Sequence, residues 1–343
     1  MHIRDVAKSL KMSVATVSRA LNPQTSHLVA EKTRRRVQKF VQEVGYVPNR
    51  TARELSTGKT RTIGVVLPNV LQSVFFNDYL IKILAGVYRV LEQDNTYNCK
   101  IIITPRGKVL SELDNQVLGS GLDGLLLSPY CDHAFYSSHY LPKNVLTKWM
   151  QPLVILNLRP KSPRRFHSVY LNHFDAARKA VLHLILKGHK LIAMIKGDSL
   201  FPESVDRFDG YRAALQEHGI KPNMNLVQEG NFLLESGYEA TLRLFRQDVL
   251  RPTAIFCAND EMALGAIRAL KSLNIACPRE VAVMGFDGIE IGEYVEPRLT
   301  TMAQPTHQIA EAATRLLLDQ LAGKIKGPVA TAVPANLVIR DSV

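Results

Sequence analysis

Several apolar segments of this 343-residue sequence are followed closely by polar side chains. The residues concerned are Asn157 and Arg159 after segment 153–156, Arg207 after 191–195, Asn259 after 254–258, and Asp287 after 281–286. An arginine fork beside a carboxylate can hold vicinal hydroxyl groups, and an arginine alone can hold a carboxylate. These residue types therefore predict a site for a small polar ligand.

The apolar segments must position these side chains. They form two sets, 63–68, 100–104, 123–128 and 153–157, followed by 191–195, 254–258 and 281–285. Continuous apolar strands that alternate with helix-length segments are typical of parallel sheets covered on both faces. We therefore expect two Rossmann-like halves that face each other, with the ligand beyond the carboxyl ends of the strands.

The positive charge of the chain is concentrated at its beginning. The net charge is +12, and residues 1–61 hold 13 Lys and Arg against four acidic residues, which leaves +3 for the remainder. A basic block of this kind attracts the phosphate backbone of nucleic acids, with an affinity that falls steeply with salt. A solvated or lipid-facing basic face is the alternative.

The same region has the apolar spacing of three short helices. The inward positions are Ile3, Val6, Ala7 and Leu10, then Val17, Ala20 and Leu21 after a cap at Ser13, then Val37, Phe40, Val41 and Val44 before Gly45. Three short helices with a tight turn between the first two predict a helix-turn-helix, whose second helix enters the major groove.

Longer motifs resemble a known family. Ile3–Lys8 (IRDVAK), Ser13–Asn22 (SVATVSRALN) and Gly45–Asn49 (GYVPN) are similar to the headpiece of the lactose/galactose repressor family. The resemblance continues through Thr60–Val66, Ala258–Ala266, Gly285–Asp287 and Pro297–Pro305. It implies an all-α helix-turn-helix headpiece followed by an α/β periplasmic-binding-protein-like core of two Rossmann-like subdomains.

This resemblance also implies a domain plan and a function. The expected parts are a headpiece at 1–48, a hinge helix at 49–60 and a core at 61–343, with one subdomain at about 61–160 and 291–322 and the other at about 161–290 and 323–343. The function implied is a ligand-responsive transcription regulator, expected to repress, that binds a palindromic double-stranded operator as a homodimer. No heptad repeat follows Val333, so a tetramer is not indicated.

The resemblance assigns roles to residues of the second helix. It places Val14, Ala15 and Arg19 at base edges and Thr16 and Ser18 nearer the backbone, and Asn22 completes the expected contacts. Arginine can donate two hydrogen bonds to guanine, whereas valine and alanine offer apolar contact to a thymine methyl. A phosphate contact or a solvated charge remains the alternative for the arginine.

Segment 49–60 is too short to be a stable helix alone, so it should become ordered on DNA. In the resembled family this segment is the hinge helix, which docks in the minor groove. Leu55 would then wedge between base steps at a CpG or similar step, with Ala52 allowing close approach and Asn49 also contacting DNA. The alternative for Leu55 is packing on the core.

Two departures from the family pattern affect the headpiece. Lys11 stands where the family usually has glycine in the turn, so either it adopts a left-handed conformation or the turn differs. The third helix begins at Val29-Ala30-Glu31, without the usual Ser or Thr cap.

The resemblance places Arg207 and Asp287 in the effector cleft and Phe75 or Phe76 at its aromatic position. A sugar or sugar derivative is the effector that these residue types favour, since an aromatic ring can cover its C–H face. Simple pairing of the arginine with the aspartate is the alternative. Asn157 replaces a common acid, and basic loop 159–167 could favour a phosphorylated or acidic effector or be merely solvated.

Other classes of function find little support. Gly197–Leu200 spells an esterase signature, but the chain has no Asp-x-x-His, and the histidine pairs lack the companions of a metal site. No Walker or GxGxxG loop is present, so no cofactor is expected. No apolar run approaches the length of a membrane span and no signal peptide is evident, so we expect a cytoplasmic protein. A cytoplasmic solute-binding module without gene control is the alternative.

Overall fold

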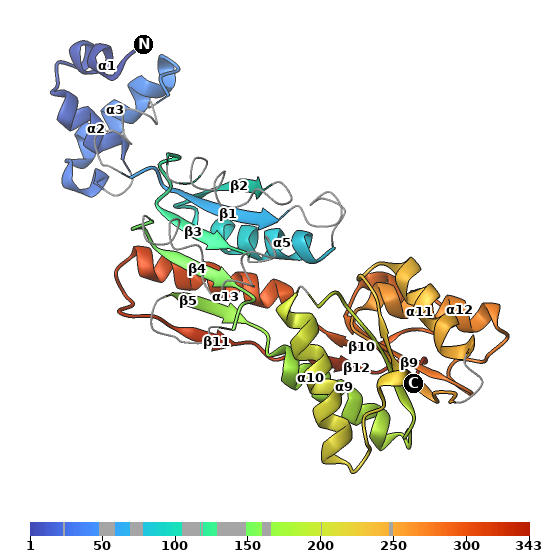
Figure 1. The fold of residues 1–343 in the computed structure, drawn as a ribbon. Helices are drawn as coiled ribbons and strands as arrows, with labels where there is room; N and C mark the ends of the chain where they lie inside the picture. The colour runs from blue at the N-terminus through green and yellow to red at the C-terminus, as the bar shows by residue number, and fades with distance from the viewer. Residues whose placement is uncertain are drawn as a thin grey trace. The chain divides into compact units, whose positions relative to one another are not determined.

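The computed structural model describes residues 1–22, 25–47, 59–68, 78–104, 117, 119–128, 149–159, 166–199, 201–246 and 250–343. The chain forms two compact units, Met1–Thr60 and Arg61–Val343 (Figure 1). Five residues with an expected role in DNA or effector binding lie outside the described residues: Asn49, Ala52, Leu55, Phe75 and Phe76.

The first unit contains the helices expected from the apolar spacing. They are α1 (Ile3–Leu10), α2 (Val14–Leu21), the short η1 (Ser26–Leu28) and α3 (Glu31–Glu43). Val6, Val17 and Val37, one from each α-helix, are 0% exposed and meet in one small core. Burial of these side chains holds together helices that would be marginal alone.

The ends of these helices account for both departures from the family pattern. Lys11 ends α1 in the left-handed conformation (φ 53°, ψ 46°), which glycine usually provides. Ser13 caps α2, since its hydroxyl accepts a hydrogen bond from the Thr16 N–H at 3.0 Å. Ala30 precedes α3 without a side-chain cap, and Gly45 follows it with φ 62°. Of the two alternatives for the turn between α1 and α2, the structure has the first, in which Lys11 is left-handed.

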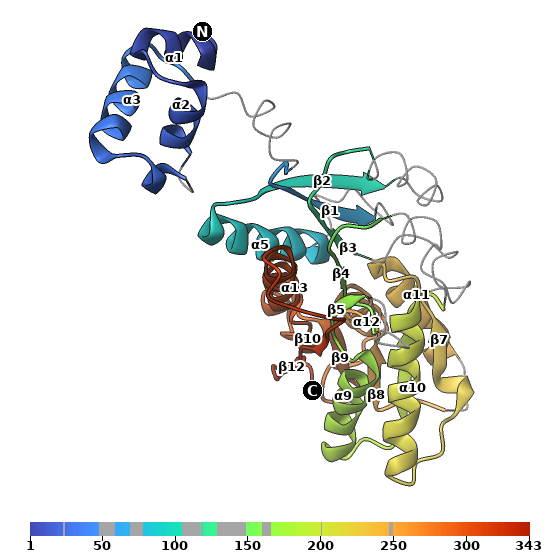
Figure 2. The ribbon, with the colours of Figure 1, turned by 90° about the vertical axis from the view of Figure 1, so that its left-hand side faces the viewer.

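The second unit begins with a six-stranded sheet of order β11-β5-β4-β3-β1-β2. Its strands are β1 (Thr62–Pro68), β2 (Asn98–Thr104), β3 (Gly124–Leu127), β4 (Leu153–Leu156), β5 (His167–Tyr170) and β11 (Ala330–Ala332). Helices α5 (Asp78–Asp94) and α13 (Thr306–Leu321) pack together on one face (Figure 2). Leu126 joins the core on the side of these helices, whereas Leu125 and Leu127 join a separate core on the other face.

A second six-stranded sheet has the order β12-β10-β9-β8-β6-β7. Its strands are β6 (Ile192–Lys196), β7 (Val227–Glu229), β8 (Ala254–Cys257), β9 (Ala282–Asp287), β10 (Thr300–Ala303) and β12 (Asn336–Val338). Helices α9 (His173–Leu186) and α10 (Pro202–Glu217) pair with each other, as do α11 (Leu234–Arg246) and α12 (Asp260–Ser272). Short η3 (Met224–Leu226) precedes β7, and η4 (Glu290–Glu293) follows β9.

The chain crosses between the two sheets three times, as expected, but at later positions than expected. It crosses after β5, after β10 and after β11. The order of the strands therefore assigns 167–170 and 330–332 to the first sheet and 300–303 to the second, in place of boundaries near 160, 290 and 322. The displaced strands are short and contain His, Ser or Thr, so an apolar pattern does not mark them.

Candidate functional site

Helix α2 has one buried face and one exposed face, and the exposed face carries both polar and apolar side chains. Val14 is 41% exposed, and Ala15, Ser18 and Arg19 are also exposed. Val17 and Ala20, on the opposite side, are at most 1% exposed. Because residues four apart share a face of a helix, the exposed residues form one continuous surface.

Two more residues expected near DNA lie at the ends of α2. Thr16 is half-buried, and its hydroxyl lies 2.8 Å from the Ser13 hydroxyl, which fixes the first turn. Asn22 ends the helix, and its N–H donates to the Ser18 carbonyl at 3.1 Å. The structure thus brings all described members of this set onto or beside one helix.

The second site is built around Arg207 of α10, which is 2% exposed. Its guanidinium lies 4.0 Å from the centre of the Phe286 ring, and its Nη1 donates to the Ala258 carbonyl. Its Nε donates to Nδ1 of His173 at 3.4 Å, and Nη1 lies 3.6 Å from Oδ1 of Asp287. Arg207 is thus held from several sides by residues of α9, β9 and the end of β8.

His173 is a neutral hydrogen-bond donor in this arrangement. Burial, together with the charge of Arg207, holds its pKa well below the usual value, so the ring carries one proton. Nδ1 accepts from Arg207, which places that proton on Nε2. Nε2 is buried and has no partner among the described residues. An unsatisfied buried donor of this kind is rare in folded proteins.

Asp287 ends β9 with φ 125°, a conformation that residues other than glycine rarely adopt. Burial raises its pKa to about 7, the charge of Arg207 opposes the rise, and the charge of Asp260 adds to it. Gln304 donates to its Oδ1 at 2.6 Å. The side chain of Asp287 keeps 28% of its surface exposed. The carboxyl group can therefore accept or donate a hydrogen bond near neutral pH.

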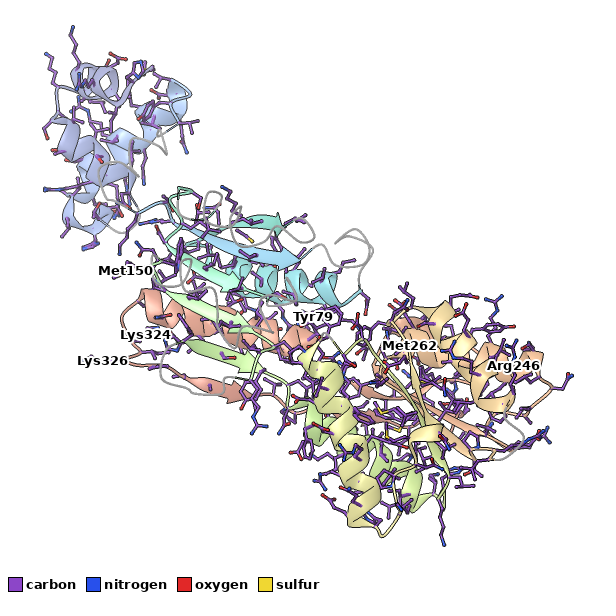
Figure 3. All side chains as sticks on the ribbon, in the orientation of Figure 1. Tyr79, Met150, Arg246, Met262, Lys324 and Lys326 are labelled. Carbon is purple, nitrogen blue, oxygen red and sulfur yellow. The ribbon has the colours of Figure 1, made fainter. Side chains whose placement is uncertain are left out.

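The first sheet contributes the facing side of the site. Asn157 follows β4 with φ 53°, accepts from the Leu171 N–H at 3.1 Å and donates to the Tyr79 hydroxyl at 3.0 Å. Burial raises the pKa of Tyr79, and the charges of Glu203, Asp287 and Arg207 also act on it. Figure 3 shows Tyr79 where the two halves of the core face each other.

The remaining expected residues have other positions. Asn259 caps α12 through the Met262 N–H at 3.0 Å and donates to the Phe232 carbonyl at 2.8 Å, so both ends of its amide are used within the protein. Arg159 is exposed, and its charge acts on Asp206. The structure therefore brings Asn157, Arg207 and Asp287 together, with Arg159 outside this group.

Sequence reasoning missed three residues that the structure places in or beside this group, Tyr79, His173 and Glu203, and it also missed Phe232, whose carbonyl accepts from Asn259. Phe232 has φ 69° and meets Phe201 edge to face, with ring centres 5.6 Å apart. Gly197 gives its ring room, since a Cβ atom there would lie 2.1 Å from the ring. Phe232 follows β7, so the same carboxyl-end rule would have found it had this short polar strand been recognised.

Comparison with known proteins identifies the chain. Residues 2–49 match the bacterial regulatory proteins of the lacI family, and residues 181–343 match a periplasmic binding protein-like domain. The transcriptional repressor CytR of Escherichia coli strain K12 is 33% identical over 99% of this chain and 95% of its own length. The chain belongs to the lacI family. Catabolite control protein A of Priestia megaterium is 32% identical, over 99% of this chain and 98% of its own.

Solved structures agree with this assignment of a lacI-family regulator. The lac repressor dimer bound to operator and the anti-inducer ONPF has a TM-score of 0.85 and 26% identity, covering 100% of this chain and 98% of that one. The transcriptional regulator CelR in complex with cellobiose has a TM-score of 0.73 and 29% identity over 100% of both chains. CytR and the lac repressor are repressors and CelR is a transcriptional regulator, which confirms the prediction of a regulator and not an esterase.

Two further features concern only the part of the chain that the structure describes. None of its helices is long and apolar enough to cross a membrane. No cluster of three or more His, Cys, Asp or Glu side chains there could hold a metal ion.

The raised pKa of Asp287 predicts a pH dependence of stability. Its pKa is about 7 in the folded chain against 3.8 ordinarily, so the folded chain binds this proton more tightly than the unfolded chain. The stabilisation is fully present below pH 3.8 and is lost as the pH rises through about 7. The measurement is the melting temperature of the wild type and of Asp287→Asn at each pH. The difference, wild type minus variant, should fall between pH 3.8 and about 7 and stay constant above pH 7. A difference that rises with pH would contradict the assignment.

Proposed function

We propose that this lacI-family protein is a repressor that binds a palindromic operator as a homodimer and is controlled by a sugar or sugar derivative. One observation supports it above others: a family headpiece is joined to a cleft in which Arg207, Asp287 and the neutral His173 offer a cation, a titratable carboxyl group and an N–H donor. An operator-binding protein would act on chromosomal DNA in the cytoplasm.

The proposed DNA contacts are Val14, Ala15, Thr16, Ser18, Arg19 and Asn22 on or beside α2, with Asn49, Ala52 and Leu55 in the minor groove. The exposure of Arg19 supports direct reading of guanine, because its guanidinium is free to reach the floor of the major groove. Val14 supports an apolar contact, since an exposed valine at the start of a helix has no role in the headpiece core.

Exposed apolar side chains on the core support a dimer. Ile101 and Ile103 of edge strand β2 are 43% and 37% exposed, and their partners on β1 belong to the core beneath α5. They therefore lie on the face of the sheet that α5 covers. Ile81 and Tyr88 of α5 are also exposed, at 43% and 66%. Together these side chains supply an apolar surface that a second copy could bury.

The proposal of a sugar as effector rests on a site whose side chains can form many hydrogen bonds but whose charges compensate each other. Arg207 is already paired with Asp287, so a polyhydroxyl ligand can bridge them without leaving either charge buried alone. Phe232 offers a ring for the C–H face of a sugar, and Phe75 or Phe76 would add another. The similar regulator CelR was solved with cellobiose.

Coupling between the ligand and DNA would pass through the relative orientation of the two halves of the core. Lys82 of α5 donates to the Gly288 carbonyl after β9 at 3.2 Å and also pairs with Asp78, so one side chain joins the two halves. A ligand that contacts both halves favours one orientation of the pair. In a dimer this orientation would set the separation of the two segments 49–60.

DNA reading is testable by selecting duplexes from a randomised palindromic library with the purified protein at low salt. Arg19→Ala should weaken the best duplex about 10- to 100-fold and relax selection at one position per half-site, the loss expected for one bidentate guanine contact. Arg35→Ala, an exposed arginine of α3 paired with Glu31, is the control and should leave the selected sequence unchanged. Absence of any selected palindrome would contradict the operator proposal.

Effector binding is testable by a thermal-shift screen of the full-length protein against sugars, sugar phosphates and nucleosides. A ligand at a hundred times its Kd should stabilise the protein by about 2.7 kcal/mol and raise its melting temperature by a few degrees. Arg207→Ala should abolish the shift. Arg212→Ala, an exposed arginine on the same helix, should preserve it. An undiminished shift in Arg207→Ala would remove this residue from the site.

A further inference from the structure

The peptide group between Gly288 and Ile289, in the turn that follows β9, is held at both ends. Its carbonyl accepts a hydrogen bond from Nζ of Lys82 at 3.2 Å, and its N–H donates to Oδ2 of Asp260 at 2.8 Å. Lys82 belongs to α5, which packs on the first sheet, whereas Asp260 begins α12, which packs on the second (Figure 1). A cation of one half of the core and a carboxylate of the other therefore meet through a single peptide group.

Asp260 binds this turn with a fully buried side chain. The residue is 0% exposed, and its Oδ2 also accepts from the Gly288 N–H at 2.7 Å. Its Oδ1 accepts from the Thr301 hydroxyl at 2.6 Å. Burial raises the pKa of Asp260, and these three hydrogen bonds oppose the rise. Because all three groups donate, they favour the carboxylate form of the residue.

Two glycines make room for this arrangement. A Cβ atom at Gly285 of β9 would lie 2.0 Å from Oδ1 of Asp260, and one at Gly288 would lie 2.6 Å from Cβ of Ala303. Gly288 also has φ 75°, a conformation that glycine adopts without strain. The absence of side chains at these two positions therefore lets the carboxylate lie against the turn.

Lys82 is oriented on its own half of the core by Asp78, whose Oδ2 lies 2.7 Å from Nζ. An ammonium group has three donors, so it can bind this carboxylate and the Gly288 carbonyl together. Hydrogen bonds in a chain polarise one another, so a peptide group between an ammonium and a carboxylate binds each of them more strongly than it would bind one alone.

The residue before this peptide group is Asp287, which faces Arg207 in the candidate site. Its φ of 125° needs support from its surroundings. The peptide group that follows Asp287 supplies this support, since its carbonyl accepts from the Gln304 N–H at 3.0 Å and its N–H, that of Gly288, donates to Asp260. A displacement of the turn would thus move both the carboxyl group of Asp287 and the carbonyl that Lys82 holds.

We propose that Asp260 is a positioning residue for the candidate site, which fixes turn 287–289 so that Asp287 faces Arg207 and Lys82 of the opposite half holds the Gly288 carbonyl. The turn is then a latch between the two halves, and a ligand that moves Asp287 also moves the latch. This role in coupling rests on the proposed function, whereas the latch itself rests only on contacts within the chain.

Hydrogen–deuterium exchange at residues 287–291 of the full-length protein, measured by mass spectrometry, tests the latch. Asp260→Asn should speed exchange there about 10- to 100-fold, the worth of a buried hydrogen bond to a charged group. Thr301→Val is the matched control, because it removes the hydrogen bond to Oδ1 and keeps both to Oδ2, so exchange should stay as in the wild type. Equal acceleration in both variants would indicate a general loosening of the core and overturn the proposal.

Lys82→Met separates positioning from structural support. It should speed exchange at the same residues about three- to tenfold in the wild-type background, and not at all in Asp260→Asn, because the latch is already open there. Arg89→Met, which removes an exposed cation of α5 that pairs with Glu311, should leave the turn unchanged. Wild-type exchange in Lys82→Met, or effects that multiply in the double variant, would overturn the proposal.

These measurements remain decisive in two unfavourable cases. If Asp260→Asn does not fold, the comparison of Lys82→Met with Arg89→Met still tests the latch. Neither operator nor effector is added, so a failure to find either one would contradict the proposed function without changing the exchange results.

Discussion

A guanidinium group buried inside the second unit constrains the candidate site around it. Burial of a charge costs several kcal/mol unless hydrogen bonds and an opposite charge compensate it. Arg207 obtains this compensation from the Ala258 carbonyl, His173, Asp287 and the face of Phe286. These groups follow β8, begin α9 and end β9, so one charge organises much of the carboxyl edge of the second sheet.

The same charge sets the chemistry that the cleft offers. It orients His173 so that its proton lies on Nε2, and it opposes the rise in the pKa of Asp287 that burial causes. From the first half of the core, Asn157 after β4 and Tyr79 of α5 close the group through a hydrogen bond of 3.0 Å, and Lys82 of α5 reaches the Gly288 carbonyl. A ligand bound here would contact both halves of the core, which is the requirement for a ligand to change their orientation.

The sequence predicted the parts of the fold that burial dictates. Continuous apolar runs marked strands such as β1, β3, β4 and β8, because strands buried on both faces need apolar residues throughout. The same rule could not find β5 or β10, where hydrogen bonds of the sheet hold segments rich in His, Ser and Thr, and the expected subdomain boundaries were displaced accordingly. At Lys11 the sequence departed from the family pattern but the structure did not, since the lysine adopts the left-handed conformation that glycine usually provides.

The candidate site was predictable where it follows recognised strands. Asn157 and Asp287 each stand directly after an apolar run, and Arg207 stands on the helix that follows another. His173, Glu203 and Tyr79 lie on helices, where their spacing is that of ordinary amphipathic segments, so only tertiary packing brings them to the cleft. The cap formed by Asn259 likewise depends on a backbone partner that the sequence does not specify.

The central claim is that ligand binding at Arg207 and operator binding by the headpiece are thermodynamically coupled. The most direct measurement determines the operator Kd with and without saturating ligand and the ligand Kd with and without saturating operator. The two ratios should be equal and should differ from one by about five- to 150-fold, as linkage requires for allosteric sites. A ligand that binds the wild-type protein tightly but leaves the operator Kd unchanged would contradict the account.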